Sequence, residues 1–163
     1  MKTKIVDNYL PKDVFDDLQK YIICSYFPWF YQSHVGTADD PKEHVFLAHT
    51  FYDNDQPRDK WYWERLCLPI LRTFNYKALL RVKANLYLNQ TKIITHNSHT
   101  DFSFPHVGAL MFWNTNNGST IIDDKPIQSV ANRMVFFDAS KPHTSTTQDD
   151  EKTRVTMIFN YIP

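Results

Sequence analysis

The chain has 163 residues, which is the length of one ordinary domain and enough to bury a hydrophobic core. Hydrophobic residues make up 42% of it and charged residues 22%, a composition that excludes a disordered or fibrous protein. Lysine and arginine together number 18, as do aspartate and glutamate, so the formal net charge is zero. This balance argues against a general nucleic-acid or anionic-membrane binder, which requires a basic surplus.

Scarce glycines and cysteines exclude several common functional motifs. Gly36, Gly108 and Gly118 are the only three glycines, and no two have the spacing of a dinucleotide-binding or phosphate-binding loop. Cys24 and Cys67 form neither a zinc-binding nor a disulfide pattern. With no signal-peptide pattern, we expect a cytoplasmic protein, in the host cytoplasm if it is viral. No apolar stretch approaches the ~20 residues of a membrane span, so no membrane partner is expected.

The sequence pattern of the first half of the chain predicts helices and irregular structure. Pro11 precedes an apolar stripe with helical spacing that extends to residue 22. A second stripe over 63–74 contains Pro69, which costs about 3 kcal/mol inside a helix, so this helix should kink or restart there. Residues 25–60 have no clear period and are predicted to be irregular, with some short strands. We therefore expect 1–79 to be a helical and irregular support.

Beyond residue 79 the hydrophobic period changes to two, which indicates strands. Residues 80–88 and 154–161 both alternate between apolar and polar side chains, and 107–113 and 134–137 are also strand-like. Asn116-Asn117-Gly118 is a turn signal, because Asn-Gly tolerates the positive φ of a type I′ turn. The pattern predicts a single mainly β domain over 1–163, with an antiparallel barrel or sandwich at about 80–163 and helices packed on its outer face.

The polar faces of the two alternating strands have two interpretations. They carry Arg81, Lys83, Asn85, Tyr87, Arg154 and Thr156. If helices cover the apolar faces, these side chains point inward, and the cost of burying unpaired charge then requires water and a charged ligand in the interior. Alternatively, the polar faces are the solvent side of an open sheet. The sequence favours neither.

One histidine is followed by an acid two residues later, in His99-Thr100-Asp101. On an extended chain these two side chains point to the same side, so they can bind one metal ion. His143, just beyond the predicted strand 134–137, is the best candidate for a third ligand. Two imidazoles and one carboxylate form the facial triad of non-haem Fe(II) enzymes, which leaves positions open for substrate and dioxygen. The His-x-Asp pattern alone is a weak signal, and the order of the surrounding elements strengthens it.

The last predicted strand opens with Arg154-Val155-Thr156. The planar guanidinium of an arginine can hold a carboxylate through two parallel hydrogen bonds. Thr156 lies on the same face and can add a hydroxyl donor. This pair suits the far end of a dicarboxylate co-substrate whose 2-oxo acid end chelates iron.

Taken together, these stretches resemble the Fe(II)/2-oxoglutarate-dependent oxygenases, and most closely their prolyl-hydroxylase-like branch with its small stand-alone bacteriophage members. The resemblance covers about half the chain and rests on 81–87, 99–101, 108–114, 117–120, 132–138, 143 and 154–156. The chain departs from the branch at 117–120, where a Gly-Gly pair is common. The resemblance implies a double-stranded β-helix, which is a jelly-roll, cupin-like barrel.

The resemblance also implies a site and a reaction. It implies Fe(II) ligands at His99, Asp101 and His143, a salt bridge from Arg154 to the C5 carboxylate of 2-oxoglutarate, and further co-substrate contacts at Thr156, Tyr87 and Asn85. No catalytic residue beyond the metal ligands is implied. The implied reaction consumes O2 and hydroxylates an unactivated C–H bond of a peptide side chain or small molecule, releasing succinate and CO2.

Two other functions stay open. An AlkB-like nucleic-acid demethylase usually has a second arginine six residues after the first, but Asn160 occupies that position here, and the neutral charge also argues against nucleic acid. A non-enzymatic cupin-like module that binds a metal or ligand is the other alternative.

Several residues near the motif have no assigned role, and the substrate and oligomeric state are also open. His96 forms H-x-x-H with His99, which could indicate zinc, but no second pair supports it. His96 and His106 flank the motif, Arg81 and Lys83 either line a substrate entrance or are solvated, and Trp29 and Tyr31 are packing aromatics or face a substrate.

Overall fold

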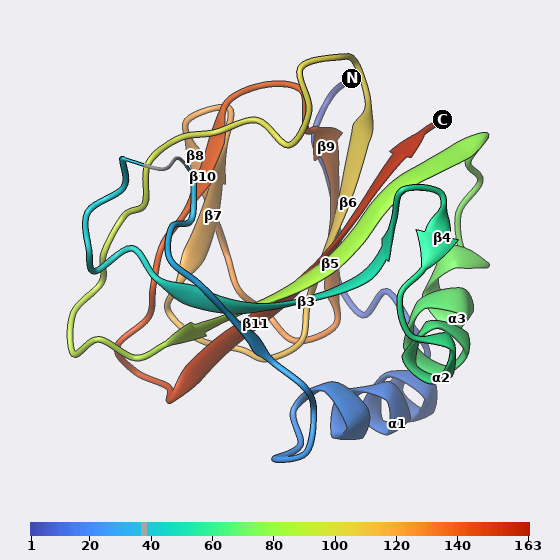
Figure 1. The fold of residues 1–163 in the computed structure, drawn as a ribbon, viewed down its shortest axis with the longest axis horizontal. Coiled ribbons are helices and arrows are strands. Elements are labelled where there is room, and N and C mark those ends of the chain that lie inside the picture. The colour runs from blue at the N-terminus through green and yellow to red at the C-terminus, as the bar shows by residue number, and fades with distance from the viewer. Residues whose placement is uncertain (37–38) are drawn as a thin grey trace.

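The computed structural model describes residues 1–36 and 39–163 as two antiparallel β-sheets with helices on one outer face (Figure 1). Within those residues the large sheet has eight strands in the order β1-β9-β6-β11-β5-β3-β2, with β4 paired to β3. Their bounds are β1 (Lys4–Val6), β2 (Phe30–Gln32), β3 (Phe46–Asp53), β4 (Gln56–Pro57), β5 (Ala78–Leu88), β6 (Val107–Phe112), β9 (Arg133–Asp138) and β11 (Thr153–Ile162). The small sheet consists of β10 (His143–Ser145), β7 (Ser119–Ile122) and β8 (Lys125–Gln128) in that order.

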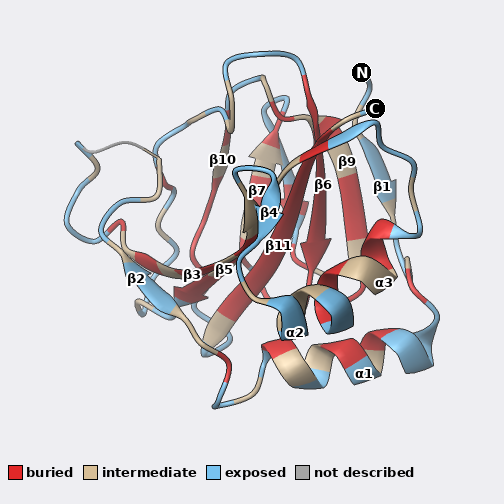
Figure 2. Cartoon of the chain, turned by 45° about the vertical axis from the view of Figure 1, so that its right-hand side comes forward, coloured by how far each residue is buried: buried red, intermediate tan, exposed pale blue. Residues whose placement is uncertain are grey.

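The helical layer consists of short elements that cover one face of the large sheet (Figure 2). Its elements are α1 (Lys12–Ile22), α2 (Lys60–Tyr62), the π-helical turn η1 (Trp63–Cys67) and α3 (Leu68–Leu71). The predicted first helix is confirmed, with Pro11 at its start and Phe15 stacked on Trp113 at a centroid distance of 5.5 Å. Pro69 lies in the first turn of α3, so the second helix restarts there after η1, as the cost of an interior proline requires. No helix of the described chain is long and apolar enough to cross a membrane.

Strand β5 shows how the two faces of the large sheet differ. Val82 and Ala84 are buried in the main apolar cluster together with side chains of the helices. Lys83, Asn85 and Tyr87 alternate with them and line a cavity on the opposite face. The inward interpretation of the polar strand faces is therefore correct, and the open-sheet alternative is wrong. A second apolar cluster joins the inner faces of the two sheets beside that cavity.

The segment before residue 80 contributes more sheet than its sequence predicts. The expected helical and irregular support includes β3, which has eight residues and pairs with β5. Its register shifts between Thr50 and Tyr52, so Phe51 and Tyr52 both pack on the helical side. This bulge interrupts the alternation that would otherwise identify a strand.

The expected type I′ turn lies elsewhere. None of Asn116, Asn117 and Gly118 has a positive φ, so that prediction is wrong. The two-residue loop between β7 and β8 is instead Asp123-Asp124, with φ of 50° and 58°, which is the backbone that a type I′ turn requires.

Asn132 fixes the N-terminal segment to the large sheet. Its φ is 62°, a left-handed conformation that asparagine tolerates better than most residues. Its side-chain oxygen accepts a hydrogen bond from Leu10 N at 2.9 Å, and its amide nitrogen donates to Leu10 O at 2.8 Å. Because the residue is buried, both Leu10 groups would be left without a partner if this side chain were removed.

We predict that Asn132→Ala lowers the free energy of unfolding by about 3 kcal/mol, from two lost buried hydrogen bonds and added backbone strain. Denaturant unfolding followed by circular dichroism measures this. The control is Asn54→Ala, at an exposed site with φ of 47°, which carries the strain alone and should lose about 1 kcal/mol. Equal losses in both variants would contradict the role given to the Leu10 hydrogen bonds.

Candidate functional site

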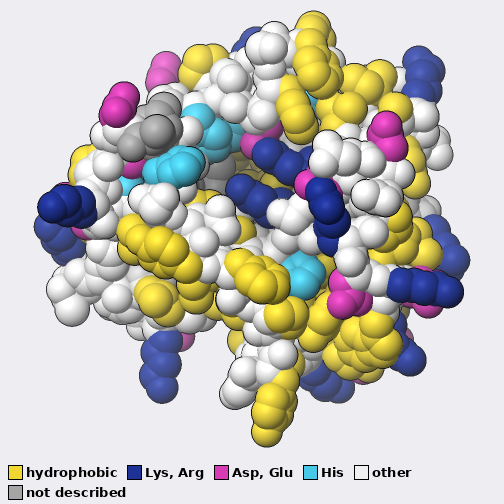
Figure 3. All heavy atoms as spheres, viewed as in Figure 1, with side chains coloured by type: hydrophobic (Ala, Val, Ile, Leu, Met, Phe, Trp, Pro, Cys, Tyr) yellow, Lys and Arg dark blue, Asp and Glu magenta, His cyan; other side chains and the backbone are white. Residues whose placement is uncertain are grey.

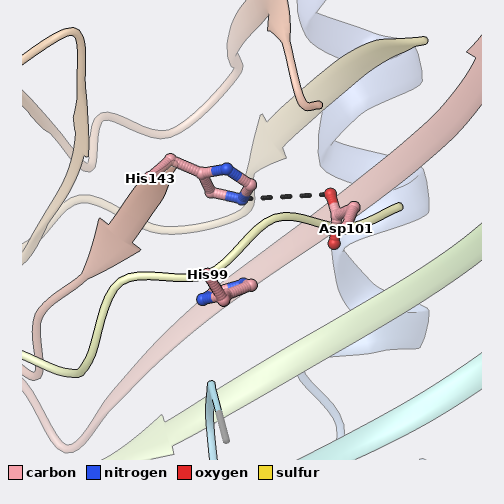
Figure 4. Close-up of side chains that lie close together, drawn as sticks. All are labelled: His99, Asp101 and His143. Carbon is pink, nitrogen blue, oxygen red and sulfur yellow. Dashed lines mark ion pairs between the residues drawn. The ribbon is translucent and has the colours of Figure 1, made fainter. Parts of the chain in front are cut away.

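The three candidate metal ligands converge at one point (Figure 4). One ligand atom from each of His99, Asp101 and His143 lies within 4.8 Å of the other two. The backbone positions them: His99 and His143 face each other across an antiparallel bridge and exchange two N–H···O bonds of 2.9 Å. Asp101 N donates to Ala139 O at 3.2 Å, which holds the second half of the His-x-Asp motif beside the same segment.

The histidine rings are prepared to act as neutral ligands. His143 Nδ1 lies 3.0 Å from Lys141 O, so this nitrogen donates and leaves Nε2, which is 3.9 Å from Asp101 Oδ2, with its lone pair free. His99 Nδ1 is buried and has no hydrogen-bond partner among the described residues. Burial lowers the pKa of His99, and the neighbouring His143 lowers it further. Neutral imidazole is the form that binds metal, so these residues fit a divalent cation.

The carboxylate of Asp101 is held by two residues that the sequence did not assign to the site. Arg81 donates to its Oδ1, and Asn160 Nδ2 donates to its Oδ2 at 2.8 Å. Burial raises the pKa of Asp101, but the charge of Arg81 outweighs it with the help of His143 and Asn160, so the pKa lies below its usual value. The carboxylate is therefore ionised and oriented, and each oxygen keeps a lone pair for a metal.

The triad lies in a cavity between the two sheets, part of it open to solvent. Figure 3 shows a hollow in the surface in which lysine and arginine atoms are visible. Every residue of the predicted site lines the cavity: His99, Asp101, His143, Arg154, Thr156, Tyr87 and Asn85. The structure thus brings together side chains that the sequence places in four separate segments.

Arg154 is fully buried, and the part of the chain that the structure describes supplies no counter-charge for it. Nε donates to Ser129 Oγ and Nη2 donates to Thr120 Oγ1, each at 2.7 Å, while Nη1 has no partner. Among the described residues no carboxylate lies within ion-pair distance of it. Burial lowers the pKa of Arg154 to about 10, opposed by the nearby Tyr87, so the group stays charged at neutral pH. An unpaired buried charge is costly, which indicates an anionic ligand.

Gly118 makes room for this arginine. A Cβ built at Gly118 would lie 2.7 Å from Arg154 Cδ and 2.8 Å from Thr147 O. The glycine in the Asn-Gly pair is therefore required for close packing and not for a positive φ. Ser129 gave no signal in the sequence, whereas Thr120 lies in the Asn-Gly-Ser-Thr stretch of the family resemblance.

Tyr87 lines the cavity and contacts both Arg154 and His96. Arg154 Cζ lies 5.3 Å from the centre of the Tyr87 ring, which stacks on His96 at a centroid distance of 5.2 Å. His96 Nδ1 is 2.9 Å from Ser145 Oγ, and that hydroxyl donates to the Tyr87 hydroxyl at 3.3 Å. His96 thus supports the cavity wall from behind and contributes no ligand atom to the triad.

The two remaining co-substrate candidates lie on paired strands. Thr156 pairs with Asn85 across β11 and β5, two residues along each strand from the pair formed by Arg154 and Tyr87. Asn85 Oδ1 is buried without a partner, and Thr156 is only 2% exposed. Both can therefore satisfy polar groups of a ligand in the cavity.

The residues that the sequence left open divide between the cavity and its surroundings. Lys83 lines the cavity, and Arg81 donates a hydrogen bond to Asp101, which also lines it. Tyr31 is 66% exposed, Trp29 packs on Phe27 at 4.7 Å, and His106 Nδ1 lies 2.9 Å from Phe104 O. None of these last three is among the residues lining the cavity.

The chain resembles solved oxygenase structures along nearly its whole length. A prolyl-4-hydroxylase from Pseudomonas putida matches with a TM-score of 0.61 at 13% identity, over 99% of this chain and 92% of that one. A prolyl hydroxylase from Trichoplax adhaerens, in complex with a hypoxia inducible factor peptide fragment, matches with a TM-score of 0.61 at 12% identity, over 98% and 83% of the two chains. HygX from Streptomyces hygroscopicus, with nickel and 2-oxoglutarate bound, matches with a TM-score of 0.59 at 10% identity, over 99% and 82%.

No family model matches the sequence, and no curated protein matches it either. At 10–13% identity the structural likeness establishes the fold. The expected double-stranded β-helix is confirmed, and with it the resemblance to 2-oxoglutarate oxygenases of the prolyl-hydroxylase type at the level of fold.

We predict that Arg81→Met lowers the stability of the metal-free protein by about 3 kcal/mol at pH 7, because it leaves the buried Asp101 carboxylate without its cation. The pKa of Asp101 is low in the folded protein, so its contribution to stability is present above the unfolded-state pKa and is lost as the pH falls through the folded-state value. The difference between wild type and variant should therefore shrink below about pH 4.

Urea unfolding at pH 7, 5 and 3 tests this, with Arg58→Met as the control. Arg58 pairs with Asp53 at the surface, where an ion pair contributes about 1 kcal/mol or less. A loss for Arg81→Met that is the same at all three pH values would contradict the electrostatic explanation.

Proposed function

We propose that this protein is a non-haem Fe(II)- and 2-oxoglutarate-dependent dioxygenase that hydroxylates an unactivated C–H bond. The observation that carries the proposal is the buried, uncompensated guanidinium of Arg154 in the same cavity as the His99, Asp101 and His143 cluster. A metal triad alone fits many proteins, and a buried arginine alone fits many anions. Their combination fits a co-substrate that chelates a metal at one end and carries a carboxylate at the other. We propose that residues 1–163 act as one oxygenase domain.

His99, Asp101 and His143 would hold Fe(II), and Arg81 and Asn160 would keep the Asp101 carboxylate oriented toward it. Fe(II) at this position would activate O2, with oxidation of 2-oxoglutarate to succinate and CO2, for hydroxylation of a C–H bond.

The chain itself contributes binding, orientation and exclusion of water. Ser129 and Thr120 hold two nitrogens of Arg154, which leaves Nη1 to meet the distal carboxylate. Thr156 and Asn85 would add polar contacts along the co-substrate. Leu110, Phe137 and Ile158 form apolar parts of the wall and limit the access of water.

For the substrate, we propose a peptide side chain or a small molecule. The fold is shared with a prolyl hydroxylase solved with a peptide fragment and with HygX, whose structure was also solved with hygromycin B bound. The neutral net charge of the chain favours these classes over nucleic acid.

The direct test is conversion of 2-oxoglutarate to succinate by the Fe(II)-loaded protein, measured without any added substrate as uncoupled turnover. We also expect Mn(II) and 2-oxoglutarate together, at 100-fold above their dissociation constants, to raise the melting temperature by about 5 °C or more. His99→Ala should abolish both effects, because it removes a metal ligand. His34→Ala, an exposed histidine, serves as the control and should behave as wild type.

If wild type neither forms succinate nor gains thermal stability, the proposed function is wrong. Stabilisation by the metal and 2-oxoglutarate without succinate formation would instead identify a non-enzymatic binding module.

We predict that Arg154→Met weakens 2-oxoglutarate binding by about 100-fold and leaves Mn(II) affinity within about threefold of wild type. The fold should survive, because an apolar side chain of similar length replaces a buried charge. Calorimetric titration measures both affinities, and Arg72→Met, at an exposed position, is the control. Equal losses of metal and 2-oxoglutarate affinity would contradict a role for Arg154 at the distal carboxylate.

A further inference from the structure

Lys83 is a second cation in the same cavity. It lies on β5 between Arg81 and Asn85 and pairs with Ile158 on β11. Residues two apart on a strand are about 6.6 Å apart on the same face, so Lys83 is the direct neighbour of the arginine that contacts Asp101. It therefore lies toward the metal-binding end of the cavity, whereas Arg154 pairs with Tyr87 four residues further along β5.

The ammonium group of Lys83 packs against an aromatic ring. Within the described residues, neither a hydrogen bond nor an ion pair joins it to another side chain, and its contact is with the Phe46 ring, 5.1 Å from Nζ to the ring centre. Burial lowers the pKa of Lys83 to about 8, with a further contribution from Arg81 and opposed by the charge of Asp101, so most of the amine is protonated at pH 7. A half-buried cation without an acceptor has the same need for an anion as Arg154.

Each of the two cations lies against one ring of an aromatic pair. Tyr87 and Phe46 stack at a centroid distance of 5.6 Å, with Arg154 Cζ over the Tyr87 ring and Lys83 Nζ over the Phe46 ring. Asp101 is the one acidic residue among those lining the cavity, and a bound metal would take up its charge. The cavity thus offers two unpaired protein cations at separate positions, which matches a dianion better than a monoanion.

We infer that Lys83 binds the carboxylate at the 2-oxo acid end of the co-substrate, so that Lys83 and Arg154 together hold the two ends of one dicarboxylate. This inference rests on the proposed function. It makes Lys83 a binding residue that selects a 2-oxo diacid over a ligand with the distal carboxylate alone. The competing source of an anion at this position is an acidic group of the substrate to be hydroxylated.

Two probes distinguish these roles on the Zn(II)-loaded protein, which does not turn over. One is 2-oxoglutarate, and the other is 4-oxopentanoate, which has a methyl group in place of the C1 carboxylate and keeps the distal carboxylate. Calorimetry measures the first dissociation constant, and ligand-observed NMR measures the second. The variants are Lys83→Met, Lys83→Arg, Arg154→Met, and Lys125→Met as an exposed lysine control.

We expect Lys83→Met to weaken 2-oxoglutarate binding about 10-fold and to leave 4-oxopentanoate binding within twofold of wild type. Lys83→Arg should restore most of the 2-oxoglutarate affinity because it keeps the charge. Arg154→Met should weaken both probes, since both carry the distal carboxylate, and Lys125→Met should change neither. A melting temperature at or above that of wild type would show that Lys83→Met folds.

The inference is overturned if Lys83→Met binds 2-oxoglutarate as wild type does, a result that would leave the substrate's acidic group as the anion for Lys83. Equal weakening of both probes would overturn it too, because it would indicate a distorted cavity. Failure of the wild-type protein to bind 2-oxoglutarate would be failure of the proposed function itself. These three results are distinguishable within the one set of titrations.

Discussion

The burial of the Arg154 guanidinium without a carboxylate partner is the constraint on which the organisation of the site depends. A buried charge must be offset by hydrogen bonds, polarisable rings or a ligand. Two hydroxyls, from Thr120 and Ser129, satisfy part of it, and Tyr87 and Phe112 place their rings against it. The buried arginine also explains the glycine at position 118, because a Cβ at Gly118 would clash with Arg154 Cδ. Nη1 of Arg154 remains available to donate hydrogen bonds to an anion.

The large sheet can accommodate the buried charge of Arg154 because its two faces have different functions. One face of β5 and β11 packs under the helices in the main apolar cluster and supplies the burial that stabilises the fold. The other face is free to hold polar and charged groups in a confined space between the sheets. The small sheet closes that space, and through β10 it also brings His143 opposite His99. Stability and ligand binding are therefore supplied by alternate residues of the same strands.

Three cationic side chains lie in or beside the cavity, and among the described residues one of them has a carboxylate partner and two do not. At the metal end Arg81 is matched by Asp101, which is further held by Asn160. Lys83 and Arg154 have no carboxylate partner among the described residues, and they lie against the stacked Phe46 and Tyr87 rings, respectively. A divalent cation at the triad would add to this positive potential. The interior is thus arranged for a ligand with negative charge at both ends, of which 2-oxoglutarate is the example proposed.

Local patterns in the sequence determined much of this protein. The apolar stripe of α1, the alternation along β5 and β11 and the His99 and Asp101 pair could all be predicted, because each depends on residues a few positions apart. Tertiary structure alone decided that the polar strand faces point inward, since that depends on which face the helices cover. It also decided the partners of the key charges: Thr120 and Ser129 for Arg154, and Asn160 and Arg81 for Asp101. Those contacts join residues 20 to 59 positions apart, and sheet register, which no short sequence pattern encodes, sets which of them meet.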